Sequence, residues 1–286
     1  MLWIVCVFGL YLLVLGAIAW ISVHPPRIPI YLSPSAMDVP EESVEFISQG
    51  TSLKGWWIPA DVPTAVVVYA HGYMMNLCEL TPEAAHWQKR GVSGLVFDHR
   101  AHGRSGGRKC GFGFVEAEDI ITAVEVARGK APGVKVILHG SSMGSAAIAI
   151  AVARRPDIAD AIILDSCYSK LAAATLGWWR FLGGNLLMVL LSPTTLIAIP
   201  MTGFNPFSVD IAESLKRIKD VPILFLHGDR DNLATPEDAN RNFAACPGPK
   251  SIKWFEGCGH SEGRWLQSEN YREAVGDFLK SIGALG

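Results

Sequence analysis

The sequence predicts an α/β fold, a mostly parallel sheet with helices on both faces. Three observations predict it. Short runs of apolar, often β-branched residues recur along the chain, each of the length of one strand. Stretches with helical periodicity separate these runs, as connections between parallel strands require. The runs are apolar at successive positions rather than at alternate ones, which is typical of strands buried on both faces.

The expected elements follow in a regular order after residue 42. SVEFIS and LKGWWIP predict two strands around a turn at Gln49-Gly50. Later strands are expected at 65–70 (AVVVYA), 94–99, 135–139, 160–166, 221–228 and 251–257. Helices are expected over 81–90, 115–129, 145–155, from Pro236, and over 268–282. No repeat or low-complexity tract interrupts this alternation.

The first 23 residues carry no charged side chain. As a helix they would extend roughly 35 Å at about 1.5 Å per residue, enough for a bilayer core of about 30 Å. Trp3 and Trp20 stand near its ends, where aromatic rings favour the membrane interface. We therefore expect a single-pass transmembrane anchor over 1–23, a Pro-rich extended linker over 24–42 and a folded domain over 43–286. Because the sheet begins after the linker, that domain is expected to act without the anchor.

A cleaved signal peptide is the alternative for the same segment, because Ala17-Ile18-Ala19 resembles a cleavage site. Against it, no Lys or Arg precedes the apolar run, and the run is longer than a usual signal core. Arg27 is the only basic residue among the first fifty, so the sequence does not fix the side of the membrane on which the domain lies. It does not fix the oligomeric state either.

Composition excludes several function classes. The formal net charge is −2 and no basic stripe is present, so no nucleic-acid partner is expected. The chain has neither the G-x-G-x-x-G nor the G-x-x-x-x-G-K-[ST] phosphate loop of nucleotide-binding α/β proteins. Its six cysteines lack C-x-x-C and zinc spacing, and no metal site is predicted.

A nucleophilic serine is predicted at Ser142. The pattern G-x-S-x-G occurs three times, around Ser105, Ser142 and Ser261. Only the second follows an expected strand (KVILH) and opens an expected helix. A sharp turn between strand and helix would raise the serine hydroxyl above the sheet edge, and flanking glycines relieve the crowding there.

A serine needs a base, and the base needs an acid to orient it. The chain order expected after such a serine is acid and then histidine. His260 lies on a Gly-rich loop after the last strand, whereas His227 ends a strand and is expected to shape a turn. Asp231 follows the next-to-last strand and is the predicted acid. The alternatives are Asp165, held in reserve, and Asp229, a turn cap.

A developing oxyanion requires two preorganised N–H donors. The first expected donor is the backbone N–H of Met143, at the N-terminus of the helix after Ser142, where the helix dipole also favours negative charge. The second is the backbone N–H of Tyr73, in the loop after YAHG.

Five blocks in order carry a resemblance: YAHGY (69–73), FDHRAHGRSGG (97–107), HGSSMG (139–144), HGDRD (227–231) and GCGH (257–260). Over residues 43–282 the chain resembles the α/β-hydrolase superfamily, and within it the single-pass membrane-anchored serine hydrolases. The second block departs from the family pattern at Ala101, where glycine is usual, in a structural loop. The resemblance implies an eight-stranded sheet, a Ser-Asp-His triad and no cofactor.

An apolar insertion over about 166–210 falls where this superfamily carries its lid. One more membrane pass there would separate Asp231 from Ser142 across the bilayer, so the insertion is expected to cover the site, to lie in the interface, or both. Trp178, Trp179 and Phe181 are the expected substrate contacts; ordinary core filling is the alternative. An apolar lid favours a lipophilic ester or acyl substrate.

The predicted activity is therefore a membrane-anchored serine hydrolase, an esterase or lipase. An acyl-protein thioesterase or a serine peptidase with the same triad, and a non-catalytic membrane adaptor on a hydrolase scaffold, are the alternatives. The sequence does not distinguish ester, thioester and amide substrates.

Overall fold

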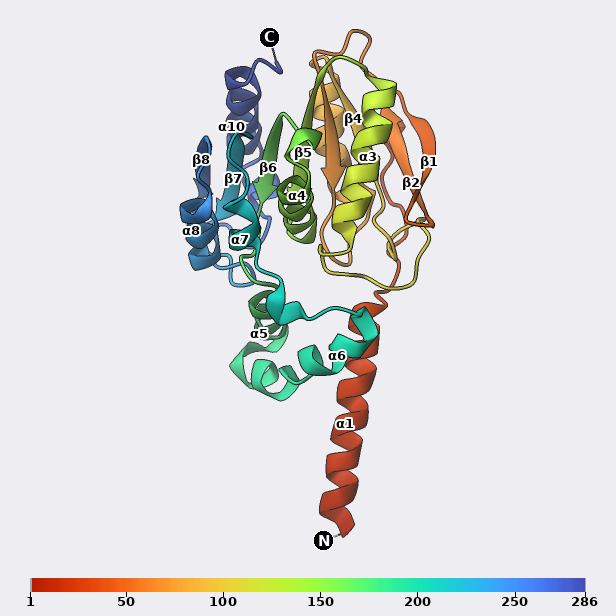
Figure 1. The fold of residues 1–286 in the computed structure, drawn as a ribbon, viewed down its shortest axis with the longest axis vertical. Coiled ribbons are helices and arrows are strands. Elements are labelled where there is room, and N and C mark those ends of the chain that lie inside the picture. The colour runs from red at the N-terminus through yellow and green to blue at the C-terminus, as the bar shows by residue number, and fades with distance from the viewer. Residues whose placement is uncertain (1, 286) are drawn as a thin grey trace.

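The computed structural model describes residues 2–285 and contains an eight-stranded sheet (Figure 1). The strands lie in the order β1-β2-β4-β3-β5-β6-β7-β8. β2 is antiparallel to both β1 and β4, and all other neighbours are parallel. The predicted mostly parallel sheet of eight strands is confirmed. The strands are β1 Glu42–Ser48, β2 Thr51–Ile58, β3 Ala65–Ala70, β4 Val92–Phe97, β5 Lys135–Ser141, β6 Ala161–Asp165, β7 Ile223–Gly228 and β8 Lys250–Phe255.

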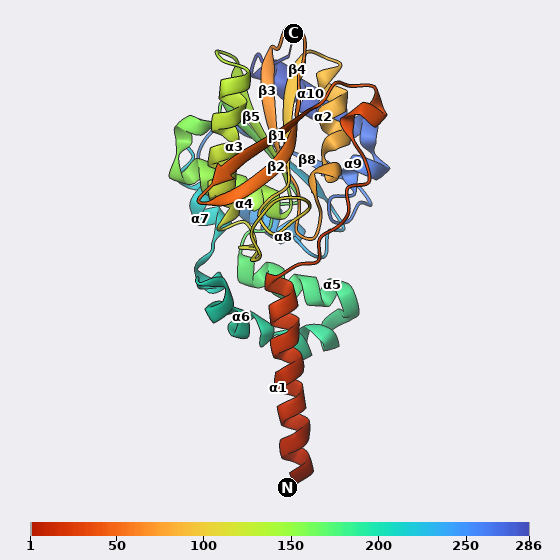
Figure 2. The same ribbon diagram turned by 90° about the vertical axis from the view of Figure 1, so that its right-hand side faces the viewer.

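Helices cover both faces of the sheet, as the continuous apolar strands predict. One face packs against α3 (Glu116–Lys130), α4 (Met143–Arg154), α7 (Ile211–Leu215) and α8 (Pro236–Ala245). The other packs against α2 (Thr81–Gln88) and α10 (Ser268–Ser281), which follows the short α9 (Gly263–Leu266). Figure 2 shows α3 and α2 on opposite sides of the strands.

The alternation of side chains along a strand explains why both faces are apolar. In β3, Val66 and Val68 belong to one core, whereas Val67 and Tyr69 belong to the other. Successive side chains of a strand point to opposite faces, so a strand with a core on each side must be apolar throughout.

β4 is the strand whose bounds differ most from the prediction, since it begins at Val92 and ends at Phe97 rather than covering 94–99. The next residue, Asp98, leaves the strand because its carboxylate serves a turn. Its oxygens accept hydrogen bonds from the backbone N–H groups of Leu77 and Arg104. A side chain that binds two loops in this way is not visible in local periodicity.

α1 (Leu2–Val23) projects from the sheet domain as a single long helix (Figures 1 and 2). Within the described residues, α1 and α5 (Leu171–Leu191) are the two helices long and apolar enough to cross a membrane by length and composition. α5 is not one straight rod, however. Gly183 and Gly184 have non-helical backbone angles that break it, so the apolar run around them does not form a continuous span.

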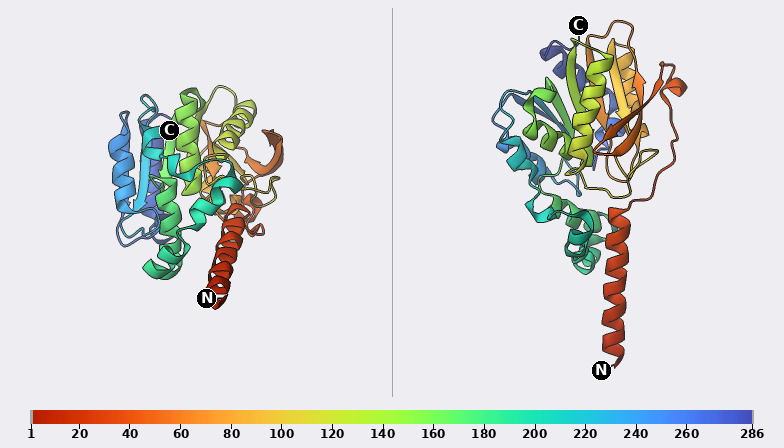
Figure 3. Two further views of the ribbon diagram at one scale, coloured as in Figure 1. Left: turned by 60° about the horizontal axis from the view of Figure 1, so that its bottom comes forward. Right: turned by 45° about the vertical axis from the view of Figure 1, so that its right-hand side comes forward.

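The insertion over 166–210, here called the lid, forms a layer beyond the edge of the sheet. It consists of α5, α6 (Thr194–Thr202) and the residues that connect them to the domain. Its two ends meet at a β-bridge between Lys170 and Asp210. Figure 3 shows α5 and α6 beside the upper part of α1, on the same side of the sheet domain.

The segment that precedes β1 contains a short 3-10 helix at Pro34–Met37 and is held tightly to the domain. The guanidinium of Arg27 donates to four backbone carbonyls of the loop 102–107. The side-chain amide of Asn76 donates to the carbonyls of Ile28 and Pro29. These bonds fix the direction in which α1 leaves the domain.

Candidate active site

Ser142 lies on the sharp turn between β5 and α4. Its backbone angles are φ 50° and ψ −110°, and a positive φ is uncommon for a residue with a side chain. The flanking glycines permit the turn because a Cβ at Gly140 would lie 2.4 Å from the nitrogen of Ser145, and one at Gly144 would lie 2.0 Å from the carbonyl oxygen of Ala70. The geometry is that of a nucleophile elbow.

The structure brings Ser142, His260 and Asp231 into one hydrogen-bonded chain. The Oγ of Ser142 lies 2.9 Å from Nε2 of His260, and Nδ1 of His260 lies 2.8 Å from Oδ2 of Asp231. The other oxygen of Asp231 accepts hydrogen bonds from the N–H groups of Leu233 and Ala234, each at 2.9 Å. The carboxylate is buried and fixed from both sides.

The other candidate acids and the second histidine have different partners. Asp229 accepts a hydrogen bond from the N–H of Gly257 at 2.7 Å, so it caps a turn. Asp165 pairs with Arg264 at 3.1 Å, and burial raises the pKa of its carboxyl although Arg264 opposes this. Nε2 of His227 lies 2.8 Å from the carbonyl oxygen of Ala234, within the loop that carries Asp231.

The two other serines of the repeated pattern have structural partners. Ser105 donates to the carbonyl of Asp98 at 2.5 Å and accepts from the N–H of Lys54. Ser261 lies next to His260, but its hydroxyl is 3.2 Å from that of Ser141. Neither hydroxyl has a hydrogen bond to a histidine among the described residues 2–285.

The expected oxyanion donors lie on two segments beside Ser142. Met143 is the first residue of α4. Tyr73 follows Gly72, where an added Cβ would lie 3.5 Å from the Cβ of Ser142. Within residues 2–285, the backbone N–H groups of Tyr73 and Met143 donate no hydrogen bond. Both are therefore available to an oxyanion near Ser142.

A buried carboxylate, Glu79, connects the segments around the site. It accepts hydrogen bonds from the N–H of Gly72 at 2.6 Å, from the hydroxyl of Ser141 at 2.7 Å and from the guanidinium of Arg264 at 2.7 Å. Burial alone would raise the pKa of Glu79, but Arg264 and these hydrogen bonds outweigh burial and lower it. The sequence does not predict this pair, because no local pattern relates residues 185 positions apart.

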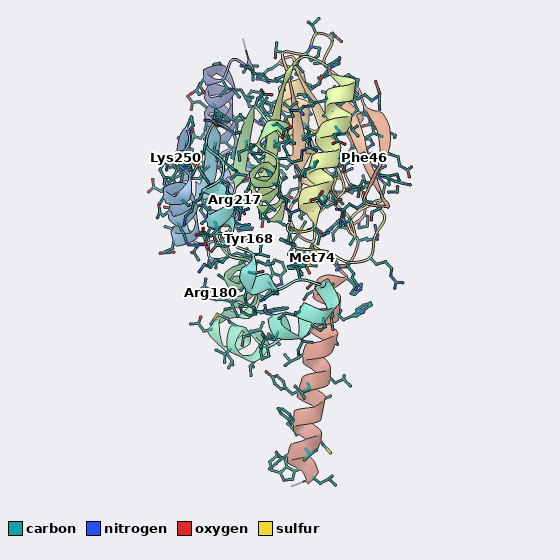
Figure 4. The ribbon with its side chains drawn as sticks, in the orientation of Figure 1. Phe46, Met74, Tyr168, Arg180, Arg217 and Lys250 are labelled. Atoms are coloured by element: carbon teal, nitrogen blue, oxygen red, sulfur yellow. The ribbon has the colours of Figure 1, made fainter. Side chains whose placement is uncertain are left out.

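A cavity of about 430 Å³ opens beside Ser142 and His260. Trp178 and Trp179 of α5 line it, together with Thr195 and Ala198 of α6. Figure 4 shows Met74 and Tyr168, two further lining residues, at the edge of the domain that faces the lid.

Phe181, the third expected contact, is not among the lining residues. It is half exposed, and its ring stacks on Trp178 with centroids 6.2 Å apart. It follows Trp178 by three positions, so it lies on the same side of α5 one turn further from the domain. Substrate contact at Phe181 stays a prediction, and in this structure the side chain reaches the cavity only through Trp178.

Comparison with known proteins gives concordant matches. A family model described as serine aminopeptidase, S33, matches residues 61–199. YqkD of Bacillus subtilis (strain 168), an uncharacterized protein, is 27% identical over 240 residues, covering 82% of this chain and 77% of YqkD. The monoglyceride lipase of Mus musculus is 24% identical over 238 residues, covering 72% of this chain and 78% of the lipase.

A solved structure shares the fold. The esterase Pf2001 of Pyrococcus furiosus superposes with a TM-score of 0.74 at 24% identity, covering 91% of this chain and 98% of the esterase. The chain therefore has the α/β-hydrolase fold, and its sequence is similar to that of a serine aminopeptidase family model and of a monoglyceride lipase.

Proposed function

We propose that the protein is a serine hydrolase that cleaves an ester bond of a lipophilic acyl substrate through Ser142, His260 and Asp231. The observation that carries the proposal is the hydrogen-bonded chain from Asp231 to the hydroxyl of Ser142, at the wall of an apolar cavity. The N–H groups of Tyr73 and Met143 are the proposed oxyanion donors.

The proposed reaction has two steps. With Asp231 holding the Nδ1–H, Nε2 of His260 takes the proton of Ser142 as its oxygen attacks the ester carbonyl carbon. The oxyanion accepts hydrogen bonds from the two backbone N–H groups. His260 then protonates the leaving alcohol, which departs and leaves the acyl group on Ser142. A water molecule, deprotonated by His260, attacks this acyl-enzyme and releases the acid.

The cavity supports a lipophilic substrate. Its wall includes Trp178, Trp179, Phe112 and Leu233, and its volume falls within the range of roughly 300–1,000 Å³ usual for small-molecule sites. The names of two similar proteins, a monoglyceride lipase and an esterase, agree with an ester substrate.

We also propose the domain organisation and location that the sequence predicts. Residues 1–23 form a single-pass membrane anchor, 24–42 connect it to the domain, and 43–286 form the hydrolase domain with the lid over 166–210. The hydropathy and length of α1 support this assignment.

A panel of p-nitrophenyl esters from acetyl to dodecanoyl, with a monoacylglycerol, tests the proposal on purified wild type and Ser142→Ala. We expect hydrolysis by the wild type, with kcat/KM rising with acyl length, and none above background by Ser142→Ala. Equal turnover by the two proteins would refute it.

A peptidase is the second candidate, because the matching family model is described as a serine aminopeptidase. Aminoacyl p-nitroanilides and an acyl thioester belong in the same panel. Preference for an anilide would favour the peptidase, and preference for the thioester would favour an acyl-protein thioesterase. A wild type that is inert to the whole panel and to fluorophosphonates would favour the non-catalytic adaptor.

A further inference from the structure

We propose that the C-terminal half of α1 forms a wall of the substrate cavity, and that the acyl chain of a membrane lipid reaches Ser142 from the bilayer between α1 and the lid. This inference rests on the proposed ester hydrolysis and specifies where its substrate comes from. It assigns to α1 a role beyond that of an anchor.

The first observation is that α1 lines the cavity. Ala19 and Ser22 line it, together with Tyr73 and residues of the lid. Leu15, Ala19 and Val23 are almost fully buried, although most of α1 is exposed. Residues four apart lie on one face of a helix, so α1 has one stripe that faces protein. A helix that served only to anchor the domain would have no such stripe.

The second observation is that the same end of α1 is bonded to the site. The hydroxyl of Tyr73 donates to the carbonyl of Ser22 at 2.8 Å, and the N–H of Cys110 donates to the carbonyl of Val23 at 2.8 Å. The ring of Tyr73 also contacts Trp178 of the lid, with centroids 5.7 Å apart. The side chain of Tyr73 thus contacts both α1 and the lid, and the backbone N–H of the same residue is a proposed oxyanion donor.

The third observation concerns depth in the membrane. The hydroxyl of Tyr11 donates to the carbonyl of Leu190 in the lid at 2.6 Å. Tyr11 precedes Ser22 by eleven residues, about 17 Å along a helix at roughly 1.5 Å per residue. The bilayer core is about 30 Å thick. If α1 crosses it, the far end of the lid lies near half depth.

The exposed surface of the lid is apolar, as a location within the bilayer core requires. Its exposed side chains include Leu182, Leu186, Val189 and Leu196, each more than half exposed. Leaving such area in water costs about 25 cal/mol per Å², whereas lipid removes this cost. The single charged side chain between Leu171 and Phe204, Arg180, donates to the carbonyl of Asn232 in the domain. Figure 4 shows Arg180 in the part of the lid nearest the domain.

The positions of α1 and the lid determine the path by which an acyl chain reaches Ser142. The walls of the cavity come from α1, α5 and α6 on one side and from the carboxyl edge of the sheet on the other. A lipid ester therefore keeps its acyl chain in hydrocarbon while its carbonyl reaches Ser142. The released acid likewise stays in the membrane.

The test uses the full chain in liposomes and two matched tryptophan variants of α1. Ala19→Trp places a large ring in the cavity wall, whereas Ala17→Trp places the same ring on the exposed face of the helix. The measured quantity is the ratio of kcat/KM for a dodecanoyl ester to that for an acetyl ester. We expect Ala19→Trp to lower this ratio at least tenfold and Ala17→Trp to leave it at the wild-type value.

A second pair guards against misfolding of Ala19→Trp, which would be seen as loss of fluorophosphonate labelling. Ser22→Phe should lower the ratio and Ile21→Phe, on the exposed face, should not. Unchanged ratios in both cavity-facing variants would overturn the inference while leaving the proposed hydrolysis intact. A wild type without Ser142-dependent turnover of either ester would instead remove the proposed function itself.

Discussion

Ser142 has a backbone conformation that costs of order 1–3 kcal/mol for a residue with a side chain. The surroundings over-determine it. The N–H of Ser142 donates to the carbonyl of Asp165 at 2.8 Å, and the carbonyl of Ser142 accepts the N–H of Ala146 in the first turn of α4. The neighbouring strand β6 and the helix after Ser142 thus hold a strained turn in place, which presents the hydroxyl to His260.

Asp231 and Asp229 are two residues apart, and we expect their substitution by Asn to affect kcat very differently. We expect Asp231→Asn to lower kcat by roughly 10³–10⁴-fold, because an amide neither fixes the required imidazole tautomer nor stabilises the imidazolium. Asp229→Asn keeps an oxygen for the N–H of Gly257 and should change kcat by less than about threefold. Steady-state kinetics on a soluble ester measures both. A greater loss in Asp229→Asn, or in Asp165→Asn, would move the acid to that position.

Glu79 is expected to act as a positioning residue. Removing one partner of a buried ion pair costs about 3–5 kcal/mol of stability, so Glu79→Gln should lower Tm. It should also lower kcat by about 10²-fold, because the loop with Tyr73 loses the charged acceptor for the N–H of Gly72. The matched control is Glu83→Gln, which breaks the pair between the buried Glu83 and the partly exposed Arg272.

The two glutamate variants separate positioning from stability. Glu83→Gln should lower Tm with little change in kcat, and equal losses of kcat would contradict the role of Glu79. The pH dependence gives a second readout. The pKa of Glu79 is lowered on folding, so its charge stabilises the fold above about pH 4.5 and loses this effect as the pH falls through the lowered pKa. The Tm difference from wild type should therefore shrink in acid.

At the residue scale, the sequence predicts what a local pattern encodes. The turn at Ser142 is visible because strand, glycines and helix adjoin it, and His260 and Asp231 are visible because chain order restricts the choice. The Glu79–Arg264 pair is not visible, since each residue alone resembles an ordinary surface charge. Only the fold brings them together.

The lid is the element on which the substrate preference depends. Its helix α5 lies close to the loop of the acid, since a Cβ at Gly177 would lie 2.6 Å from the carbonyl oxygen of Leu233. Leu233 in turn donates its N–H to Asp231. The close approach requires glycine at this position and fixes the lid relative to the proposed triad.

Trp178 is expected to contribute more to acyl binding than Phe181. Loss of a buried aromatic contact is worth about 1.5–3 kcal/mol, so Trp178→Ala should lower kcat/KM for a dodecanoyl ester at least tenfold relative to an acetyl ester. Phe181→Ala, outside the cavity wall, should change this ratio by less than threefold. The ester panel measures both, and equal effects would contradict the assignment of the cavity wall.

At the element scale, the strands and helices of the domain are predictable because burial on both faces leaves a strong apolar pattern. The shape of the lid is not. Its apolar run has the hydropathy of one long segment, and hydrophobic periodicity does not place the break that the structure has at Gly183-Gly184.

In the whole molecule, the candidate site, the lid and α1 all lie at one edge of the sheet, where the parallel strands end. Ser142, Asp231, His260 and Tyr73 all follow the carboxyl ends of strands, the edge at which open α/β sheets bind ligands. The lid and α1 lie at this same edge (Figures 1 and 3). The site therefore faces the segment proposed to enter the membrane.

If α1 forms part of the cavity wall as proposed, we expect it to be retained in the mature protein. Cleavage after Ala19 would remove Ala19 itself from the cavity wall. We expect the intact mass of the membrane-extracted protein to include residues 1–23, and alkaline carbonate to leave the protein in the membrane pellet. A soluble product beginning near Trp20 would establish a signal peptide instead.

The most direct test of the central claim is the site of covalent modification by a fluorophosphonate, mapped by mass spectrometry on the full chain. The tryptic peptide 136–154 contains Ser141, Ser142 and Ser145, so fragmentation must separate them. The account predicts one adduct, on Ser142, that disappears in Ser142→Ala and in heat-denatured protein. An adduct on Ser141, Ser105 or Ser261, or labelling that persists in Ser142→Ala, would contradict it.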